Sequence, residues 1–154
     1  MAKIVDKNEA LSLSKERKLV FISGCFDLLH LGHMRFIHEA RKIVPSDVDL
    51  LIAVLSDNEV SRRKGETRPI FTFEQRVEML TYLSDVSYVL PWESTWEELR
   101  NFTGVLSPKY MAVVEGDPGI ENKKLFMENI GSQLIIINRI EGFSTSEIIA
   151  KVTK

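Results

Sequence analysis

The sequence predicts a single α/β domain built on a doubly wound, five-stranded parallel sheet. Two features of the hydrophobic pattern predict this: short apolar runs that lack polar alternation, and helical periodicity in the segments between them. Runs of this kind are typical of strands that are covered on both faces, as in a parallel sheet. The five expected strands are residues 19–22, 50–55, 86–90, 111–114 and 134–137, of which 86–90 is the weakest.

The segments between these runs carry apolar residues at the spacing of an amphipathic helix. One stripe consists of Phe36, Ile37, Ala40, Ile43 and Val44, and another of Phe73, Val77, Leu80 and Leu83. Three pairs have the spacing of a capping box and predict helix starts: Thr72 with Gln75, Thr95 with Glu98, and Ser144 with Glu147. Two further helices are expected, one over residues 120–129, ended by Gly131, and one near residues 6–15.

The order of these elements is an alternation of strand and helix. Such an order implies right-handed crossovers and an open, Rossmann-like sheet with helices on both faces. We expect this domain to occupy residues 18–154, after an N-terminal helix or extension over residues 1–17. Open sheets of this kind bind ligands beyond the carboxyl ends of their strands, where the order of the chain reverses. The loops that follow the strands are therefore the place to look for a site.

Composition narrows the class of protein and of partner. The 154 residues are 44% hydrophobic and 27% charged, which is the balance of a globular domain, and the formal net charge is −2. A net charge this small does not indicate nucleic acid as a partner. Any anion site must therefore be a local cluster of positive groups. Cys25 is the only cysteine, no apolar run approaches the roughly 20 residues that cross a bilayer, and residues 1–14 lack the apolar core of a signal peptide. We expect a cytoplasmic protein without a membrane partner.

The first loop, from Gly24 to His33, holds two histidines at the start of a predicted helix. Gly24 and Gly32 allow the backbone to approach a ligand closely, and the free N–H groups of a helix start favour an anion. His30 and His33 are three residues apart, so in a helical turn they lie on one face and can donate hydrogen bonds to one phosphate. The residues alone therefore indicate an anion site.

Two other interpretations of this loop stay open from the residues alone. A histidine near a helix start is often no more than a capped surface residue. Cys25, His30, His33 and His38 could instead bind zinc, but their spacing fits no closed set of cysteine and histidine ligands, and there is no second cysteine. We therefore expect no metal site made by protein ligands.

A basic cluster follows the second predicted strand, in a segment expected to be a loop. Arg62, Arg63, Lys64 and Arg68 lie within seven positions. An isolated cluster of this kind is usually a solvated loop. Its position after a parallel strand, at the same edge of the sheet as the histidines, favours a role in the site instead. Lysine supplies a point charge and arginine a bidentate fork, the two usual ways to hold phosphate.

The loop before the last helix, from Arg139 to Ser146, ends in Gly142-Phe143-Ser144-Thr145-Ser146. Ser144 as the N-cap is enough to explain the segment structurally. The hydroxyls and free N–H groups of the same residues would also suit a phosphate. Local sequence on its own favours the structural role.

The first loop resembles the first signature of the cytidylyltransferase-like nucleotidyltransferases, G-x-F-D-x-x-H-x-G-H. Every fixed position of that pattern is present between Gly24 and His33. The pattern is found in glycerol-3-phosphate and phosphocholine cytidylyltransferases and in heptose-1-phosphate adenylyltransferases. The segment from Lys64 to Pro69 is similar to the heptose enzymes, and the loop from Arg139 is similar to the C-terminal signature of the family. The resemblance therefore spans nearly all of residues 18–152.

The resemblance implies an enzyme that moves a nucleoside monophosphate from CTP or ATP onto a phosphorylated small alcohol or sugar. Pyrophosphate is released, and Mg²⁺ is carried with the nucleotide. The implied catalytic residues are His30, His33 and Lys64. The implied nucleotide-binding residues are Gly24, Cys25, Phe26, Asp27, Gly32, Asp117, Arg139, Gly142, Ser144 and Thr145. Arg63 and Arg68 are the candidates for the acceptor phosphate, and a homodimer is compatible with the sequence.

The sequence departs from the family at two places that concern the acceptor. Glu115 stands where the heptose enzymes typically have a lysine, and its charge would repel a phosphate. Trp92 and Trp96 lie in a segment similar to glycerol-3-phosphate cytidylyltransferases, but the lysine expected after it has no clear counterpart, although Arg100 is close. These tryptophans either wall an acceptor pocket or, as we favour, serve helix packing or a subunit contact.

The sequence argues against two other functions. A nucleotide-binding regulatory module without turnover would not need both histidines, Lys64 and the Ser144-Thr145 pair. A P-loop kinase would need its glycine-rich phosphate loop, and the sequence has no such motif.

Overall fold

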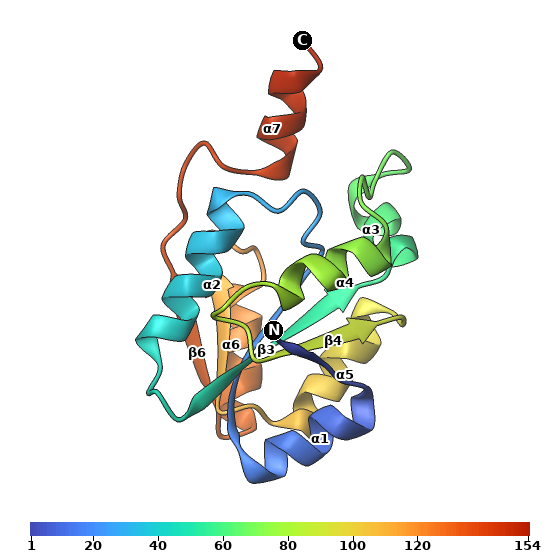
Figure 1. The fold of residues 1–154 in the computed structure, drawn as a ribbon. Helices are drawn as coiled ribbons and strands as arrows, with labels where there is room; N and C mark the ends of the chain where they lie inside the picture. The colour runs from blue at the N-terminus through green and yellow to red at the C-terminus, as the bar shows by residue number, and fades with distance from the viewer.

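The computed structural model describes residues 1–154 and shows a parallel sheet with helices on both faces (Figure 1). The strands are β1 (Lys3–Ile4), β2 (Lys18–Gly24), β3 (Val48–Leu55), β4 (Tyr88–Trp92), β5 (Tyr110–Val114) and β6 (Gln133–Ile137). The helices are α1 (Lys7–Glu16), α2 (Leu31–Ile43), α3 (Asp57–Lys64), α4 (Phe73–Thr81), α5 (Trp96–Leu106), α6 (Ile120–Asn129) and α7 (Thr145–Val152). The five predicted strands and the helices predicted near 6–15 and over 120–129 are confirmed. None of the helices has the length and apolar character needed to cross a membrane.

All strands run parallel in one sheet, in the order β1-β4-β3-β2-β5-β6. The chain moves outward from β2 through β3 to β4, and then returns to the other side of β2 with β5 and β6. The order therefore reverses between β2 and β5. Gly24 and Val114, the last residues of these two strands, flank the switch point at which such sheets bind ligands. The prediction of a doubly wound, Rossmann-like parallel sheet is confirmed.

The predicted number of five strands is wrong, because β1 adds a sixth. This strand has two residues and pairs with Tyr88 and Val89 of β4 at the edge of the sheet. Both of its residues are exposed, while the flanking Ala2 and Val5 are buried. A strand this short contains no hydrophobic run, so no sequence pattern could predict it. The boundary predicted between residues 17 and 18 stays a prediction.

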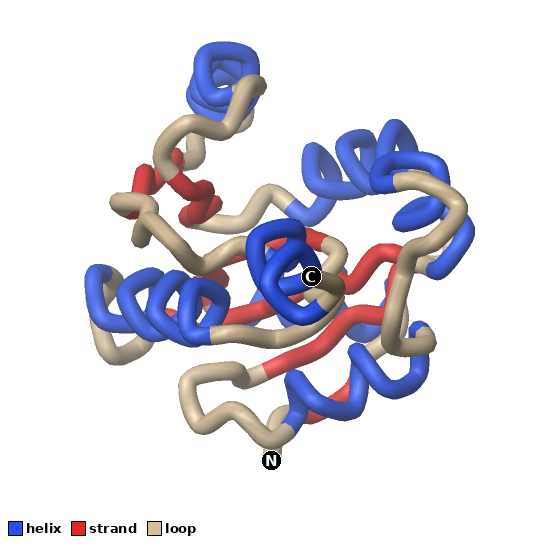
Figure 2. Tube along the Cα trace, turned by 90° about the horizontal axis from the view of Figure 1, so that it is seen from above, coloured by secondary structure: helices blue, strands red, loops and turns tan.

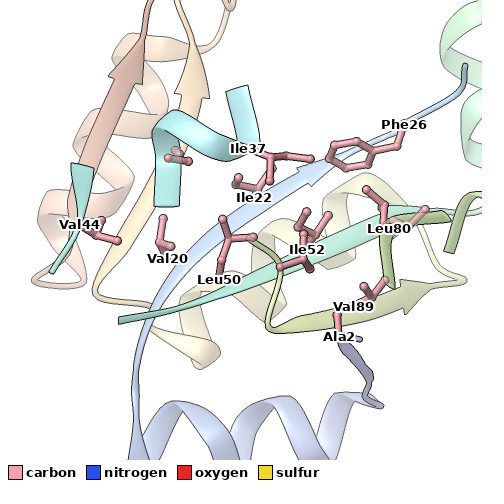
Figure 3. Close-up of a cluster of buried hydrophobic side chains, with 14 of the residues drawn as sticks. Ala2, Val20, Ile22, Phe26, Ile37, Val44, Leu50, Ile52, Leu80 and Val89 are labelled. Carbon is pink, nitrogen blue, oxygen red and sulfur yellow. The ribbon is translucent and has the colours of Figure 1, made fainter. Parts of the chain in front are cut away.

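Two layers of apolar side chains cover the two faces of the sheet. Val20 and Ile22 of β2 belong to the layer that lies under α2 and α4 (Figure 3). Leu19 and Phe21 of the same strand belong to the opposite layer, which lies under α1, α5 and α6. Successive residues of a strand point to opposite faces, so a strand that is covered twice needs an unbroken apolar run. This packing explains the hydrophobic pattern from which the fold was predicted.

The helix starts follow the predicted caps in part. Thr72 and Gln75 form a complete capping box at the start of α4. Thr95 and Ser144 cap α5 and α7 with their hydroxyls, but the return bond from the third helical residue is absent in both. A further complete box, which we did not predict, lies at the start of α1, where Asp6 is the N-cap.

Helix α3 corrects the prediction that the basic cluster lies in a loop. Ser56 caps its start and accepts the N–H of Glu59, and residues 62–64 form its last turn. Cations are stabilised there because the carbonyl end of a helix carries partial negative charge. Val60 is the only apolar residue of the helix, so there was no apolar stripe for periodicity to detect.

Helix α7 stands away from the rest of the fold at the C-terminal end of the chain (Figure 1). Seen from above, it lies over the middle of the molecule (Figure 2). None of its residues is buried. Its position therefore depends on the loop that precedes it, which is also the third sequence motif.

Candidate active site

A cleft opens at the carboxyl edge of the sheet, where β2 and β5 end. Its volume is ≈ 650 Å³, in the range of small-ligand sites. The predicted site residues that line it come from all three motifs and from the loop after β5: Gly24, Cys25, Phe26, Asp27, His30, Gly32, His33, Arg63, Lys64, Arg68, Asp117, Arg139, Ser144 and Thr145. Gly142 is the one predicted residue outside this lining, and its φ of 81° turns the last loop.

The first loop has a backbone conformation that depends on its surroundings. Phe26 and Leu28 have φ angles of 51° and 54°, in the left-handed region that residues other than glycine rarely adopt. Phe26 is buried in the core layer under α2 and α4, and that packing offsets the strain. Its ring lies against Gly24, where a Cβ would come within 3.1 Å of the ring atom Cε2. Strained loops of this kind cluster at functional sites.

His30 ends the first loop and caps helix α2. Its Nδ1 accepts the backbone N–H of Gly32 at 3.1 Å. A neutral imidazole that accepts at Nδ1 carries its proton at Nε2, so the other ring nitrogen of His30 is a hydrogen-bond donor. The capping role and a ligand-binding role are therefore compatible in this residue.

His33 lies directly beside His30, with the two ring centroids 4.0 Å apart. Burial and the neighbouring His30 lower the pKa of His33 to about 4, against a smaller opposing effect of Asp27. Burial lowers the pKa of His30 as well. The Nδ1 atom of His33 is buried and has no hydrogen-bond partner within the protein. A buried polar atom without a partner is costly, so this atom is one that a ligand can satisfy.

Asp27 joins the first loop to the segment that follows α3. Its carboxylate accepts the backbone N–H groups of Ile70 and Phe71, each at 3.0 Å, and the Nε–H of Arg68 at 2.5 Å. Asp27 is 1% exposed and Arg68 is 8% exposed. Burial alone would raise the pKa of Asp27, but the hydrogen bonds from Phe71, Ile70 and Arg68 outweigh it and hold the pKa below its ordinary value. These bonds therefore connect two separate sequence motifs.

Arg76 makes a second connection between the loops, and the sequence did not assign it to the site. It is fully buried, and its guanidinium donates to the carbonyl of Cys25 at 2.6 Å, to Asp57 at 2.7 Å and to the carbonyl of Phe71 at 3.2 Å. A buried guanidinium needs acceptors for its N–H groups, and this one draws them from three segments. In the sequence, only its position hints at this role: Arg76 is a charged residue directly before Val77, on the apolar stripe of α4.

The basic residues at the end of α3 divide into two groups. Arg62 pairs with the buried carboxylate of Glu59, at 2.5 Å from Nη2 to Oε1. Arg63 and Lys64 line the cleft and form no ion pair. Burial raises the pKa of Cys25 in the first loop, and the positive charges of Lys64 and Arg63 partly counter that rise. The field of these two cations therefore reaches the first loop.

The last loop is fastened onto the first loop. The hydroxyl of Thr145 donates to the carbonyl oxygen of Asp27 at 2.7 Å, while Ser144 caps α7. The carbonyl of Phe143 comes so close to Gly32 that a Cβ at that position would lie 2.7 Å from it. The two motifs are thus in direct contact, and the contact requires a glycine. The first N–H groups of α7 are left without partners in the helix, as at any helix start.

The two tryptophans occupy different environments. Trp92 is buried in the core layer under α5, and its Nε1 donates to the carbonyl of Thr95 at 2.9 Å. Trp96 lines the cleft, with the Arg63 guanidinium 4.7 Å and the Lys123 ammonium 5.6 Å from its ring centroid. The packing role that we favoured from the sequence therefore holds for Trp92, whereas Trp96 forms part of the cleft wall.

The lining of the cleft is positively charged, although the whole chain is not. Its basic side chains are Arg63, Lys64, Arg68, Arg100, Lys123 and Arg139, and its acidic side chains are Asp27, Glu115 and Asp117. The lining thus has three more positive than negative groups, on a chain whose net charge is −2. Charge of one sign in a cleft with low-dielectric walls attracts ligands of the opposite sign. The cleft therefore suits a polyanion.

The family comparison decides the class of this protein. The cytidylyltransferase-like family description matches residues 21–151, which include the first loop, the basic cluster and the last loop. The chain belongs to the cytidylyltransferase-like family.

Curated relatives of this cytidylyltransferase-like chain include the bifunctional protein HldE of several bacteria. HldE of Campylobacter jejuni strain RM1221 is 38% identical over 153 residues, which cover 97% of this chain and 31% of that protein. HldE of Helicobacter hepaticus is 32% identical over 157 residues, covering 99% of this chain and 31% of that protein. The chain spans about a third of the length of these relatives.

Solved structures show the same fold at low identity. A lipopolysaccharide core biosynthesis protein of Thermoplasma volcanium superposes with a TM-score of 0.63 at 20% identity, covering 80% of this chain and 96% of that one. A pantoate-beta-alanine ligase of Francisella tularensis gives a TM-score of 0.67 at 16% identity, covering 98% of this chain and 73% of that one. At these identities the likeness shows the fold alone.

Within the cytidylyltransferase-like domain, the cleft also contains residues that sequence reasoning missed. Lys123 lies on α6, in a segment that the sequence marked only as a helix, and its Nζ is 2.7 Å from Asp117 Oδ2. Arg100, considered only as a stand-in for a missing lysine, lines the cleft as well. Neither residue belongs to a sequence motif, so only the structure shows that both line the cleft.

Proposed function

We propose that this chain transfers a nucleoside monophosphate from ATP or CTP to a phosphorylated sugar or small alcohol and releases pyrophosphate. The observation that carries the proposal is the positively charged cleft at the switch point of the sheet, lined by all three motifs of the family. A triphosphate and a phosphorylated acceptor are both polyanions, and the reaction requires that they be held side by side. Nothing in the cleft favours the alternative of a regulatory module without turnover.

The reaction needs positioning and charge stabilisation more than acid–base chemistry. An oxygen of the acceptor's phosphate attacks the α-phosphorus of the nucleotide and forms a new P–O bond. The bond from the α-phosphorus to the bridging oxygen of the β-phosphate breaks, and pyrophosphate leaves with that oxygen. The attacking oxygen is already anionic at neutral pH, so no general base is required. Catalysis then consists of orientation and of hydrogen bonds to the developing charge.

The site residues divide between the phosphates of the nucleotide. His30 donates from Nε2, and His33 lies 4.0 Å from it between ring centroids, so both can stabilise the pentacoordinate α-phosphoryl group. Lys64, without an ion-pair partner in the cleft lining, neutralises the departing pyrophosphate. Ser144 and Thr145 bring the start of α7 to the β- and γ-phosphates, where its free N–H groups favour anions. Because Thr145 already donates its hydroxyl to Asp27, its backbone N–H is the group left for the nucleotide.

The remaining predicted residues frame these groups. Gly24, Cys25, Phe26 and Asp27 shape the first loop beneath the nucleotide, and Gly32 admits the last loop. Asp117, Arg139 and Gly142 are assigned to the nucleotide by their positions in the family motifs. Arg63 is the stronger candidate for the acceptor phosphate, since its guanidinium is exposed in the cleft, whereas Arg68 is buried against Asp27.

Mg²⁺ fits this site as a companion of the nucleotide. Two of the three acidic groups in the cleft, Asp27 and Asp117, are paired with Arg68 and Lys123. The donor set that suits Mg²⁺ is therefore the triphosphate oxygens with water, a common arrangement for this ion. When bound, the ion supplies neutralisation of phosphate charge.

Three observations bear on the candidate substrates: two favour ATP and a sugar phosphate, and the third concerns the base alone. The sequence is similar to HldE over nearly its whole length, and the basic segment is similar to heptose-1-phosphate adenylyltransferases. Ile140 also stands where cytidylyltransferases often have threonine, which weakens the case for cytosine.

A thermal-shift titration with ATP, CTP, GTP and UTP, each with Mg²⁺, tests the nucleotide half of the proposal. A ligand at 100 times its dissociation constant adds about 2.7 kcal/mol to the free energy of unfolding. For a chain of this size that corresponds to a rise in Tm of roughly 5–10 °C. We expect ATP or CTP to give this rise and GTP and UTP to give less. No rise with any of the four would contradict nucleotide binding.

A further inference from the structure

Strand β6 forms one edge of the sheet and has an open side. It pairs with β5 alone, and α2 and α6 lie beside it (Figure 1). The N–H of Gln133 and the carbonyl of Ile137 form hydrogen bonds on the side where β5 lies. Backbone groups alternate in direction along a strand, so the N–H and C=O groups of Leu134 and Ile136 point away from β5. Two residues of β6 therefore present their hydrogen-bonding groups at the open side.

The open side of β6 lacks the features that normally protect the edge of a sheet. Natural edges are kept from pairing by short strands, charged side chains, proline or a bulge. Residues 129–138 contain no charged residue and no proline, and the register of β6 with β5 is continuous from Gln133 to Ile137. At the opposite edge, by contrast, β1 has only two residues, and one of them is Lys3. An uncharged, β-branched segment such as β6 associates readily when it is exposed.

Exposed apolar side chains lie above and below this edge. Leu134 packs in the layer under α6, so Ile136, two residues later, points to the same face of the sheet, where it is 47% exposed. On the other face, Ile43 at the end of α2 is 61% exposed. Ile43 lies three helical turns after Gly32, on the side of α2 that contacts the loop continuing from β6. A partner at this edge would cover both isoleucines.

A second copy of this chain matches the open side of β6. Two copies related by a two-fold axis at Ile135 would pair antiparallel, with Leu134 of one opposite Ile136 of the other. In this register the outward N–H and C=O groups of the two opposite residues bond to each other. No charged residue lies between positions 132 and 138, so no like charges meet across the axis. The strand is therefore complementary to itself.

This arrangement is compatible with the cleft. Antiparallel pairing of the two sheets turns the carboxyl ends of their strands in opposite directions, so the two clefts would lie at opposite ends of the joined sheet. The last loop continues directly from β6, and pairing of β6 would hold the residues from which that loop starts.

We propose that the open side of β6 is a dimer interface, at which a second copy of this chain pairs its own β6 antiparallel and extends the sheet across a two-fold axis at Ile135. The proposal goes beyond the proposed function and does not depend on it, because the contact lies outside the cleft and involves none of the residues assigned to the reaction.

Sedimentation velocity over a range of protein concentrations measures the association. Ile136→Lys places a charge on the exposed side chain of β6, and in the dimer the two new charges would lie about 7–8 Å apart. The matched control is Ile4→Lys, the same change at a 51% exposed isoleucine of the opposite edge strand. Circular dichroism verifies that each variant is folded.

Amide hydrogen exchange of the wild type locates the contact without any substitution. The outward N–H groups of Leu134 and Ile136 face solvent in a single chain and become hydrogen-bonded in the dimer. Their exchange should therefore slow by roughly tenfold or more between dilute and concentrated protein. The N–H of Ile4 is the matched control, because Lys3 and Val5 donate towards β4 and the group between them points outward. Its exchange should not depend on concentration.

We expect the wild type to dimerise and Ile136→Lys to weaken the dimer by roughly a hundredfold or more, since each dimer loses two apolar contacts and gains a pair of like charges. Ile4→Lys should change the dissociation constant less than about threefold, as is usual for a surface site outside the contact. A wild type that stays monomeric, a dimer that folded Ile136→Lys leaves intact, or exchange at positions 134 and 136 that does not slow on dimerisation would each overturn the interface. If Ile136→Lys does not fold, the exchange measurement decides alone.

Discussion

His33 has properties that favour ligand binding but lower the stability of the free protein. Burial and the adjacent His30 lower its pKa to about 4, so the ring is neutral at pH 7. A neutral imidazole can donate to a phosphoryl oxygen and becomes more strongly bound as negative charge develops there. The Nδ1 atom of His33 is buried without a hydrogen-bond partner, and this destabilises the free protein.

The lowered pKa of His33 predicts a pH dependence of stability. The folded-state pKa of about 4 lies below the ordinary value of 6.5, so the unfolded chain takes up a proton first as the pH falls. The contribution to stability is therefore fully present above pH 6.5 and is lost as the pH falls towards 4. Between pH 7 and pH 5 we expect this residue to lower the free energy of unfolding by about 2 kcal/mol.

Urea unfolding of the wild type and of His33→Gln at pH 7 and pH 5 measures this cost. The wild type should lose about 2 kcal/mol more than the variant over that interval. His30 and the carboxylates titrate in both proteins, so their contributions cancel in the comparison. Equal losses in the two proteins would show that His33 is not held neutral by burial.

All but one of the site residues predicted from the sequence line the cleft, but the sequence did not show what each one contacts. Asp27 lies in the first loop, but its backbone donors are 43 and 44 residues away, at Ile70 and Phe71. Lys123 reaches Asp117 from the next helix. Pairings of this kind depend on how the sheet brings loops together, and no local pattern contains that information.

At the scale of elements, the first loop, the end of α3 and the last loop are tied together by buried polar contacts. Asp27 of the first loop contacts both other segments: its carboxylate binds Arg68, which follows α3, and its carbonyl oxygen accepts the hydroxyl of Thr145, which follows the last loop. Arg76 adds the contact to the carbonyl of Cys25. The three motifs thus hold one another in place, which is how separate loops can keep a common geometry.

Removing the Asp27 carboxylate should therefore destabilise the fold strongly. In Asp27→Ala the buried Arg68 would keep its charge without a partner, and such a loss costs about 3–5 kcal/mol. The matched control is Asp47→Ala, which breaks an exposed pair with Lys18 and should cost less than about 1 kcal/mol. Urea unfolding at pH 7 measures both. If Asp27→Ala cost no more than the control, the tie between the loops would carry little of the stability.

The contact between α2 and the last loop makes a second prediction at this scale. In Gly32→Ala the new Cβ would lie 2.7 Å from the carbonyl oxygen of Phe143 and 2.9 Å from Cε1 of His30. Overpacking of this kind costs about 1–3 kcal/mol, and it should displace the last loop and weaken nucleotide binding.

Gly104→Ala is the control for that variant. It lies within α5, where the nearest atom to a new Cβ is Phe126 Cζ at 3.4 Å. Alanine is the better helix former, so this change should be neutral or raise stability by up to about 1 kcal/mol. Thermal unfolding together with nucleotide titration compares the two variants. Unchanged nucleotide affinity in Gly32→Ala would show that the close contact is unimportant for the site.

The elements that the sequence predicted are those that bury apolar residues in a regular pattern. The doubly covered strands β2 and β3 have unbroken apolar runs, and their helices have clear stripes. The elements that were missed are held by other forces. Strand β1 relies on backbone hydrogen bonds to β4, and α3 relies on its cap and on the charges at its two ends.

At the scale of the whole molecule, strand order and charge distribution explain why the cleft lies where it does. The order of the sheet reverses between β2 and β5, which leaves room between the loops that follow them. The chain has a net charge of −2, yet the cleft lining has three more basic than acidic groups. The molecule thus concentrates its positive charge at the point where the fold provides a binding site.

Acceptor-dependent release of pyrophosphate is the most direct test of the central claim, that this cleft transfers a nucleoside monophosphate. The protein is incubated with Mg²⁺ and ATP or CTP, with or without a panel of sugar and polyol phosphates, and pyrophosphate is measured over time. We predict release only when nucleotide and phosphorylated acceptor are both present, and a rate about 10²–10³-fold lower in a folded His33→Ala variant. Release without acceptor, no release with any pair, or an undiminished rate in His33→Ala would contradict the account.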